Sequence, residues 1–183
     1  MRRMLFVFAA VIATAALAVP AALASVAPGT YGPDPGSFSA ANAPGSSHLA
    51  SGSPSCTVNA NLSIDCSAYV LGGVGHTNAD VLLTANYTAI VDCFNPGDPS
   101  NRNNPIESHT TSFSPASKVT VTSAKNGQLS VPAQSVSFSG APIGCPNPNW
   151  TPTIRPGSVT LVSFSYTLTF AGFSSAYITI SEP

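Results

Sequence analysis

The chain has 183 residues, of which only 7% are charged, and its formal net charge is −1. Its few basic residues are scattered, which excludes the clustered basic patch that a nucleic-acid or anionic-membrane binder needs. So few charges also leave little material for acid–base chemistry, and the polar surface must come from Ser, Thr and Asn.

Residues 1–24 have the pattern of a signal peptide. Arg2 and Arg3 precede an apolar run from residue 5 to residue 23, and small residues stand at Ala22 and Ala24. This predicts cleavage before Ser25, which leaves 183 − 24 = 159 residues with a net charge of 4 − 7 = −3. An uncleaved membrane anchor is the alternative, because the run is about long enough to span a bilayer. The prediction is a secreted, extracellular protein with no transmembrane segment in the mature chain.

Residues 25–54 are predicted to form a flexible leader. The segment contains five Pro and five Gly and shows no periodic apolar surface. Such a composition does not offset the entropy lost when its backbone is ordered. Its aromatic residues, Tyr31 and Phe38, are expected to have no partner. The folded domain is therefore predicted to span residues 55–183.

From Cys56 onward, apolar and polar residues alternate with the period of two that is typical of half-buried strands. In one long segment the apolar positions are Val81, Leu83, Ala85, Tyr87, Ala89, Val91 and Cys93. In a later one they are Val162, Phe164, Tyr166, Leu168 and Phe170. The pattern predicts an all-β antiparallel β-sandwich of about seven to nine strands, immunoglobulin-like in architecture. A closed β-barrel is the alternative.

A turn signal and a proline refine this prediction. Asn126 and Gly127 lie between two strand-like runs and are a strong signal for a hairpin, because both accept positive φ. Pro132 cannot donate a hydrogen bond to a neighbouring strand, so it indicates an edge strand or a bulge.

Four cysteines in an exported chain predict two disulfides, for which three pairings exist. Folding residues 56–66 about a three-residue loop sets Cys56 opposite Cys66, which leaves Cys93 to pair with Cys145. The alternative pairs Cys66 with Cys93 and Cys56 with Cys145. The loop-entropy model gives the favoured bridges about 3 and about 4 kcal/mol. The scattered spacing, without C-x-x-C, argues against a metal site.

Trp150, the single tryptophan, lies in NPNWTP, outside the strand patterns. It could stack on a sugar together with Tyr69, which the alternation places on the outward side of its strand. This pair is the candidate ligand surface. The favoured alternative is that Trp150 plugs the end of the sandwich beside Cys145.

Weaker signals for chemistry occur at three further places. His76 follows a Gly-rich turn, but a strand pattern and not a helix comes next, which argues against a phosphate loop. His109 lies near several Ser residues without a G-x-S-x-G or H-E-x-x-H motif. Calcium ligands could come from Asp92, Asp98 and Glu107, but the EF-hand spacing is absent. No catalytic, cofactor-binding or metal-binding residue is predicted.

Several stretches together carry a family resemblance: the Arg-Arg and alanine-rich signal, the Pro/Gly/Ser leader, VLLTANYTAIVDC, CPNPNW and VTLVSFSYTLTF. In these the chain resembles a family of uncharacterised small secreted actinobacterial β-sandwich proteins. The resemblance implies a secreted β domain and brings no established activity.

The leading hypothesis is a non-enzymatic, envelope-associated protein with an adhesive or recognition role, whose partner is a cell-envelope polysaccharide or protein. One alternative is a carbohydrate-binding module that uses Trp150. The other is a small secreted hydrolase that uses His109 or His76.

Overall fold

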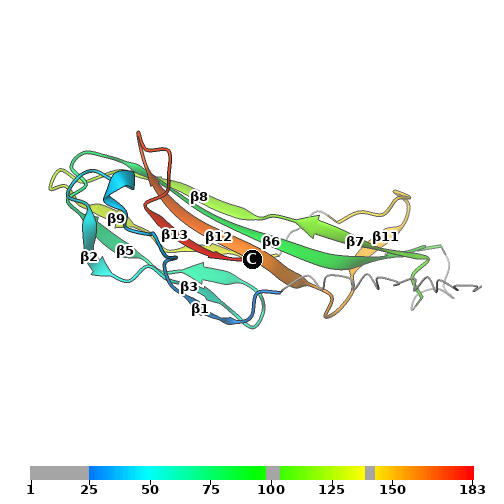
Figure 1. Ribbon diagram of the computed structural model, residues 1–183. Coiled ribbons are helices and arrows are strands. Elements are labelled where there is room, and N and C mark those ends of the chain that lie inside the picture. The colour runs from blue at the N-terminus through cyan, green and yellow to red at the C-terminus, as the bar shows by residue number, and fades with distance from the viewer. Residues whose placement is uncertain (1–24, 98–103, 139–142) are drawn as a thin grey trace, which may run out of the picture.

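The computed structural model describes residues 25–97, 104–138 and 143–183, so the predicted signal peptide lies outside the described residues. Apart from one short 3-10 helix, η1 (Ala40–Asn42), the regular elements of these ranges are antiparallel strands. The strands form two layers with the apolar core between them (Figure 1). Within the described ranges, no helix is long and apolar enough to cross a membrane.

The first layer is a six-stranded sheet built around one long strand, β6 (Ala79–Phe94). One side of β6 pairs with β8 and then β7, and the other side pairs with β12 and then β11. The last strand, β13, pairs with β12. The bounds of these strands are β7 (Glu107–Phe113), β8 (Ala116–Val121), β11 (Thr151–Ile154), β12 (Thr160–Phe170) and β13 (Ile178–Glu182).

The second layer consists of two small sheets, with the strand orders β2-β5-β9 and β1-β3-β4-β10. Each strand of the first small sheet is continuous in the chain with one of the second: β2 with β3, β5 with β4, and β9 with β10. The two small sheets therefore have the same strand order and are separated by a short break. The Ser67 hydroxyl spans this break, donating to Ser53 O and accepting from Ser55 N. The bounds are β1 (Gly29–Tyr31), β2 (His48–Gly52), β3 (Cys56–Val58), β4 (Ile64–Cys66), β5 (Tyr69–Gly72), β9 (Leu129–Val131) and β10 (Gln134–Val136).

The prediction of an antiparallel β-sandwich is confirmed. The described residues form thirteen strands. In five pairs of successive strands, the second continues the first across a short break: β2–β3, β4–β5, β7–β8, β9–β10 and β11–β12. The described strands therefore make eight longer runs. These match the expected number. The described strands lie in separate sheets and do not close into one barrel.

The alternation predicted for residues 81–93 is present in full. Each of its seven apolar positions in β6 is at most 1% exposed, and the facing layer supplies Ile64, Leu71 and Leu129, which are fully buried. Burying one such side chain contributes about 1.5–3 kcal/mol, so this interface supplies much of the driving force for folding.

In β12 the predicted alternation is wrong at one position. A register shift between Leu161 and Ser163 marks a β-bulge against β6. The extra residue lets Leu161, at 0% exposed, take the inward place, and Val162 is left partly exposed. From Phe164 onward the strand follows the predicted parity.

The prediction of a flexible leader over residues 25–54 is wrong. In this segment β1 and β2 pair with strands of the second layer, and Val26 is buried in the core. Between them the chain runs along the edge of β13, where Asp34 N donates to Thr179 O and Phe38 N donates to Tyr177 O. The segment needs no apolar period of its own, because existing sheet edges supply its hydrogen bonds.

Asn126 and Gly127 form a tight turn but not the predicted hairpin. Gly127 has φ +74° and its N–H donates to Ala124 O. However, β8 before the turn pairs with β6, whereas β9 after it pairs with β5 in the other layer. Pro132 directly follows β9, an edge strand, as predicted.

Both favoured disulfides are present, Cys56–Cys66 and Cys93–Cys145. Cys56 and Cys66 are direct partners in the β3–β4 hairpin. Its loop closes where Asn59 N donates to Ser63 O. The hairpin register therefore produces the first bridge, as the sequence predicted.

Candidate functional site

Tyr69 does not lie on the surface, so the predicted ligand surface of Trp150 with Tyr69 is wrong. The residue is 3% exposed, and its hydroxyl lies 2.9 Å from that of Tyr166 in the core. Burial raises the pKa of the Tyr69 hydroxyl. The alternation failed because Ser67 and Ala68 lie in the break between β4 and β5, where the strand parity changes.

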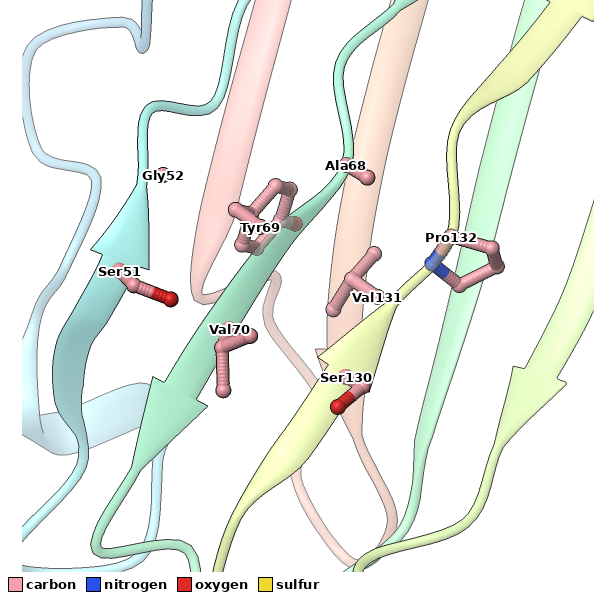
Figure 2. Close-up of a pocket in the computed structure, with 8 residues that line it drawn as sticks. All are labelled: Ser51, Gly52, Ala68, Tyr69, Val70, Ser130, Val131 and Pro132. Carbon is pink, nitrogen blue, oxygen red and sulfur yellow. The ribbon is translucent and has the colours of Figure 1, made fainter.

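A shallow, open trough of about 430 Å³ lies over this break, across β2, β5 and β9 (Figure 2). Ser51 and Ser130 flank Val70 in one row of paired residues, and Pro132 lies at the end of β9. All the residues that line the trough are described and none of them carries a charge. The trough therefore offers weak apolar contact and two hydroxyls, without a group suited to acid–base catalysis.

Trp150 belongs to the segment just before β11, and β11 lies at the opposite end of the molecule from β5, which lines the trough (Figure 1). It directly precedes β11, whose Thr151 pairs with Phe94 at the end of β6. Its side chain is half-buried, and its backbone N–H donates to Asn147 O. Of the predicted pair, only Trp150 is partly exposed. Its role as a plug at the end of the sandwich stays a prediction.

His109 does not meet the polar residues beside it in a catalytic arrangement. It pairs with Val91 and therefore shares the inward face of the sheet, and its buried Nδ1 has no hydrogen-bond partner in the described part of the chain. Ser108 and Asp92 form the neighbouring pair and point to the opposite face. These three residues consequently do not assemble a Ser-His-Asp site.

Asp92 instead forms a clamp with Arg155, which the sequence reasoning missed. Arg155 Nε donates to Asp92 Oδ2 at 3.0 Å and its terminal nitrogen donates to Oδ1 at 2.7 Å. The Ser108 hydroxyl also donates to Oδ1, at 2.6 Å. Hydrogen bonds from Arg155 and then Ser108 lower the pKa of the Asp92 carboxyl. The clamp fixes the turn between β11 and β12 against β6.

The other candidate positions do not converge either. Glu107 pairs with Cys93 and lies on the face opposite to Asp92, and Asp98 lies outside the described residues. In the described ranges no group of three His, Cys, Asp or Glu side chains is placed to hold a metal ion. His76 is exposed in a turn between β5 and β6, so a strand follows it as predicted.

The outer face of the six-stranded sheet is a broad surface of hydroxyl and amide side chains, which we call the hydroxyl face. The core and the second layer lie on the opposite side of this sheet. Register and strand alternation assign its polar members. They are Thr84, Asn86, Thr88, Ser108, Thr110, Ser112, Thr120, Thr151, Thr153, Thr160, Ser163, Ser165, Thr167, Thr169, Thr179 and Ser181.

Two ion pairs neutralise four charged side chains on the hydroxyl face, whereas Asp34, whose Oδ2 accepts from the Ser181 hydroxyl at the edge of β13, has no cationic partner among the described residues. Lys118 Nζ lies 3.2 Å from Asp80 Oδ2, and Arg155 is paired with Asp92 as described above. Hydrogen bonds from Thr120 and then Lys118 lower the pKa of the Asp80 carboxyl. The face is therefore polar and carries little net charge, and the apolar side chains of Leu82, Ile90 and Phe94 lie among the hydroxyls.

Comparisons of this chain with protein-family models, with curated proteins and with solved structures found no match.

Proposed function

We propose that this protein is a secreted, non-enzymatic recognition or adhesion module that binds a neutral polysaccharide of the cell envelope through the hydroxyl face. The observation that carries the proposal is the extent of that face together with the pairing of its charges. Hydroxyl and amide groups can donate to and accept from sugar hydroxyls. Both cationic side chains of this face, Lys118 and Arg155, are already paired with carboxylates, so the face gives no advantage to an anionic polymer.

Secretion is supported by the use of cysteine. All four cysteines of the chain are in disulfides, which form and persist in oxidising compartments. The low charge content and the hydroxyl-rich surface agree with an exported protein. The resemblance to secreted actinobacterial proteins stays a prediction.

An immunoglobulin-like architecture is part of the same proposal. In chain order, the seven runs after β1 are β2–β3, β4–β5, β6, β7–β8, β9–β10, β11–β12 and β13. One layer holds the first, second and fifth runs, and the other holds the fourth, third, sixth and seventh, in that order across the sheet. The constant-type immunoglobulin order differs in the placement of the fourth run, which there joins the first layer. The strand order thus supports the relation of architectures.

The proposal can be tested by pull-down of the purified protein with insoluble neutral polysaccharides, anionic polysaccharides and envelope fractions. Ser165 lies between Thr84 and Ser181 on the hydroxyl face, so Ser165→Lys should place an unpaired charge under the ligand and weaken retention at least about tenfold. Ser130→Lys, at the exposed position of edge strand β9 in the other layer, is the matched control and should retain binding.

Two outcomes would overturn this proposal. Failure of every polysaccharide and envelope fraction to retain the protein would remove the recognition role. Loss of binding in Trp150→Ala, with Ser165→Lys unaffected, would move the site to the half-buried Trp150 and favour the carbohydrate-binding module that the sequence suggested.

A further inference from the structure

Strand β7 is a long sheet edge that lacks the protection found at the other edges. The edge of β13 is covered by residues 34–38 of the same chain, and β11 contains Pro152. In contrast, β7 has seven residues in unbroken register with β6, and contains no Pro, Lys or Arg. Natural proteins usually block such edges, so an open one marks a place where another strand can pair.

The remaining edges are poorer templates for pairing. Strands β1, β9 and β10 have only three residues each, and β2 carries a register shift and ends at Gly52 with φ +79°. Strand β8 carries Lys118 and follows Pro115. Among the described strands, β7 therefore stands out as the edge best suited to accept a partner.

The backbone groups of β7 that face the open side can be identified. On the side of β6 that carries β7 and β8, Ala85 N donates to Pro115 O, whereas on the side of β11 and β12, Ile90 O accepts from Arg155 N. The odd-numbered residues of β6 therefore form their backbone hydrogen bonds toward β7. Their partners in β7 are also odd-numbered. By antiparallel alternation, Ser108, Thr110 and Ser112 point their N–H and C=O groups to the open side. No backbone hydrogen bond from another described segment reaches these groups.

We propose that β7 pairs antiparallel with β7 of a second copy of this chain, about a two-fold axis at Thr110. In this register Thr110 faces its own copy and Ser108 faces Ser112 of the second copy. Hydroxyl pairs of this kind are favourable across antiparallel strands. Glu107, the one carboxylate of the strand, faces Phe113, so it does not meet its own copy.

This pairing satisfies the outward N–H and C=O groups of all three residues on both copies. It also joins the two hydroxyl faces into one continuous surface, because Thr110 and its neighbours belong to that face. A single strand pair buries less than the roughly 1,200 Å² of a stable interface, so the dimer is expected to be weak and concentration-dependent. The inference does not rest on the proposed function.

Sedimentation velocity on the purified protein, from about 10 μM to about 1 mM, tests the association. We expect a monomer–dimer equilibrium. Thr110→Lys sets two like charges against each other on the axis and should weaken the dimer at least about tenfold. Ser130→Lys adds the same charge at an exposed position of another edge strand, β9, and should leave the equilibrium unchanged. A protein that stays monomeric throughout, or equal behaviour of the two variants, overturns the proposal.

A crosslinking experiment tests the register independently of folding effects. Hydrogen-bonded antiparallel partners have Cα atoms about 5.5 Å apart, within the range of a disulfide. The native cysteines are all paired, so an added thiol is the only free one. With diamide as oxidant, Thr110→Cys should form a covalent dimer, whereas Ser112→Cys alone should not, because it faces Ser108. Equal crosslinking of both variants would overturn the proposed axis.

Discussion

Tyr69 and Tyr166 join the two layers of the sandwich through their hydroxyl groups, which lie 2.9 Å apart in the core. Both residues are at most 3% exposed. Each hydroxyl therefore depends on the other for a partner, since neither is open to water.

Removing one of these hydroxyls should cost more than removing both. Tyr69→Phe leaves the Tyr166 hydroxyl buried without its partner, and we expect a loss of about 1–3 kcal/mol in the free energy of unfolding. The double variant Tyr69→Phe/Tyr166→Phe should lie closer to the wild type, because no polar group is left unsatisfied. A double-mutant cycle by urea denaturation measures this. Tyr31→Phe, whose hydroxyl makes an exposed bond to Ala27 O, is the control. Additive losses would contradict the pairing.

The buried tyrosines also predict a loss of stability at alkaline pH. Burial raises the pKa of Tyr69 and of Tyr166, and it raises the pKa of Tyr87 to about 12. In the unfolded chain these groups release their protons near pH 10. The stability they contribute is thus complete below about pH 10 and is lost as the pH rises toward the folded-state values.

Urea midpoints measured between pH 8 and pH 12 test this dependence. Each tyrosine that keeps its proton only in the folded state steepens the fall by at most about 1.4 kcal/mol per pH unit. The double variant Tyr69→Phe/Tyr166→Phe should therefore fall less steeply above about pH 10 than the wild type. Parallel curves would show that the two hydroxyls titrate alike in the folded and unfolded chains.

The clamp between Asp92 and Arg155 should matter more than the ion pair between Asp80 and Lys118. The Asp92 side chain is 12% exposed and doubly bonded to Arg155, whereas Asp80 and Lys118 are 48% and 61% exposed. Asp92→Asn should lower the Tm at pH 7, and Asp80→Asn should change it little, because exposed pairs are screened by water and salt.

At acid pH, the difference in Tm between Asp92→Asn and the wild type should disappear. The pKa of Asp92 is lowered in the folded state, so its contribution is present above the unfolded value of about 4 and is lost as the pH falls through the folded value. Thermal unfolding at several pH values between about 2 and 7 measures this. A Tm difference that persists at the acid end would contradict the ionic origin of the clamp.

How well each feature could be predicted depends on whether its cause lies close by in the sequence. The inward parity of β6 is readable because the strand is long and unbroken. The parity of Tyr69 and Val162 is not, since a break or a bulge shifts it by one residue without a mark in the composition. The Cys56–Cys66 bridge followed from a local hairpin, and the second bridge followed by elimination.

Long-range docking was beyond the sequence pattern. Residues 34–38 are ordered by the edge of β13, more than 130 residues away, as in the bond between Ser37 Oγ and Thr179 O. The Asp92–Arg155 clamp joins residues 63 positions apart, in segments whose alternation does not indicate that they are neighbours. The hydroxyl face was predicted only as a polar surface, because its pairing of charges depends on register.

Gln134 is a buried side chain whose removal should stabilise the fold. It is 6% exposed on the inward side of β10, opposite Cys66, and neither its amide nitrogen nor its oxygen has a partner among the described residues. An unsatisfied buried amide costs about 1–3 kcal/mol. Methionine has a similar length, no polar head and the flexibility to fill the space, so Gln134→Met should raise the free energy of unfolding by about 1 kcal/mol or more.

Urea denaturation of Gln134→Met beside Gln128→Met measures this gain. Gln128 is exposed and bonded to Asn126, so its replacement should bring no increase in stability. A loss of stability in Gln134→Met would show that the amide is satisfied in solution by an ordered water, since buried waters bind where protein polar groups lack partners. A gain confined to Gln134→Met would show that the core carries an unpaired amide between its two layers.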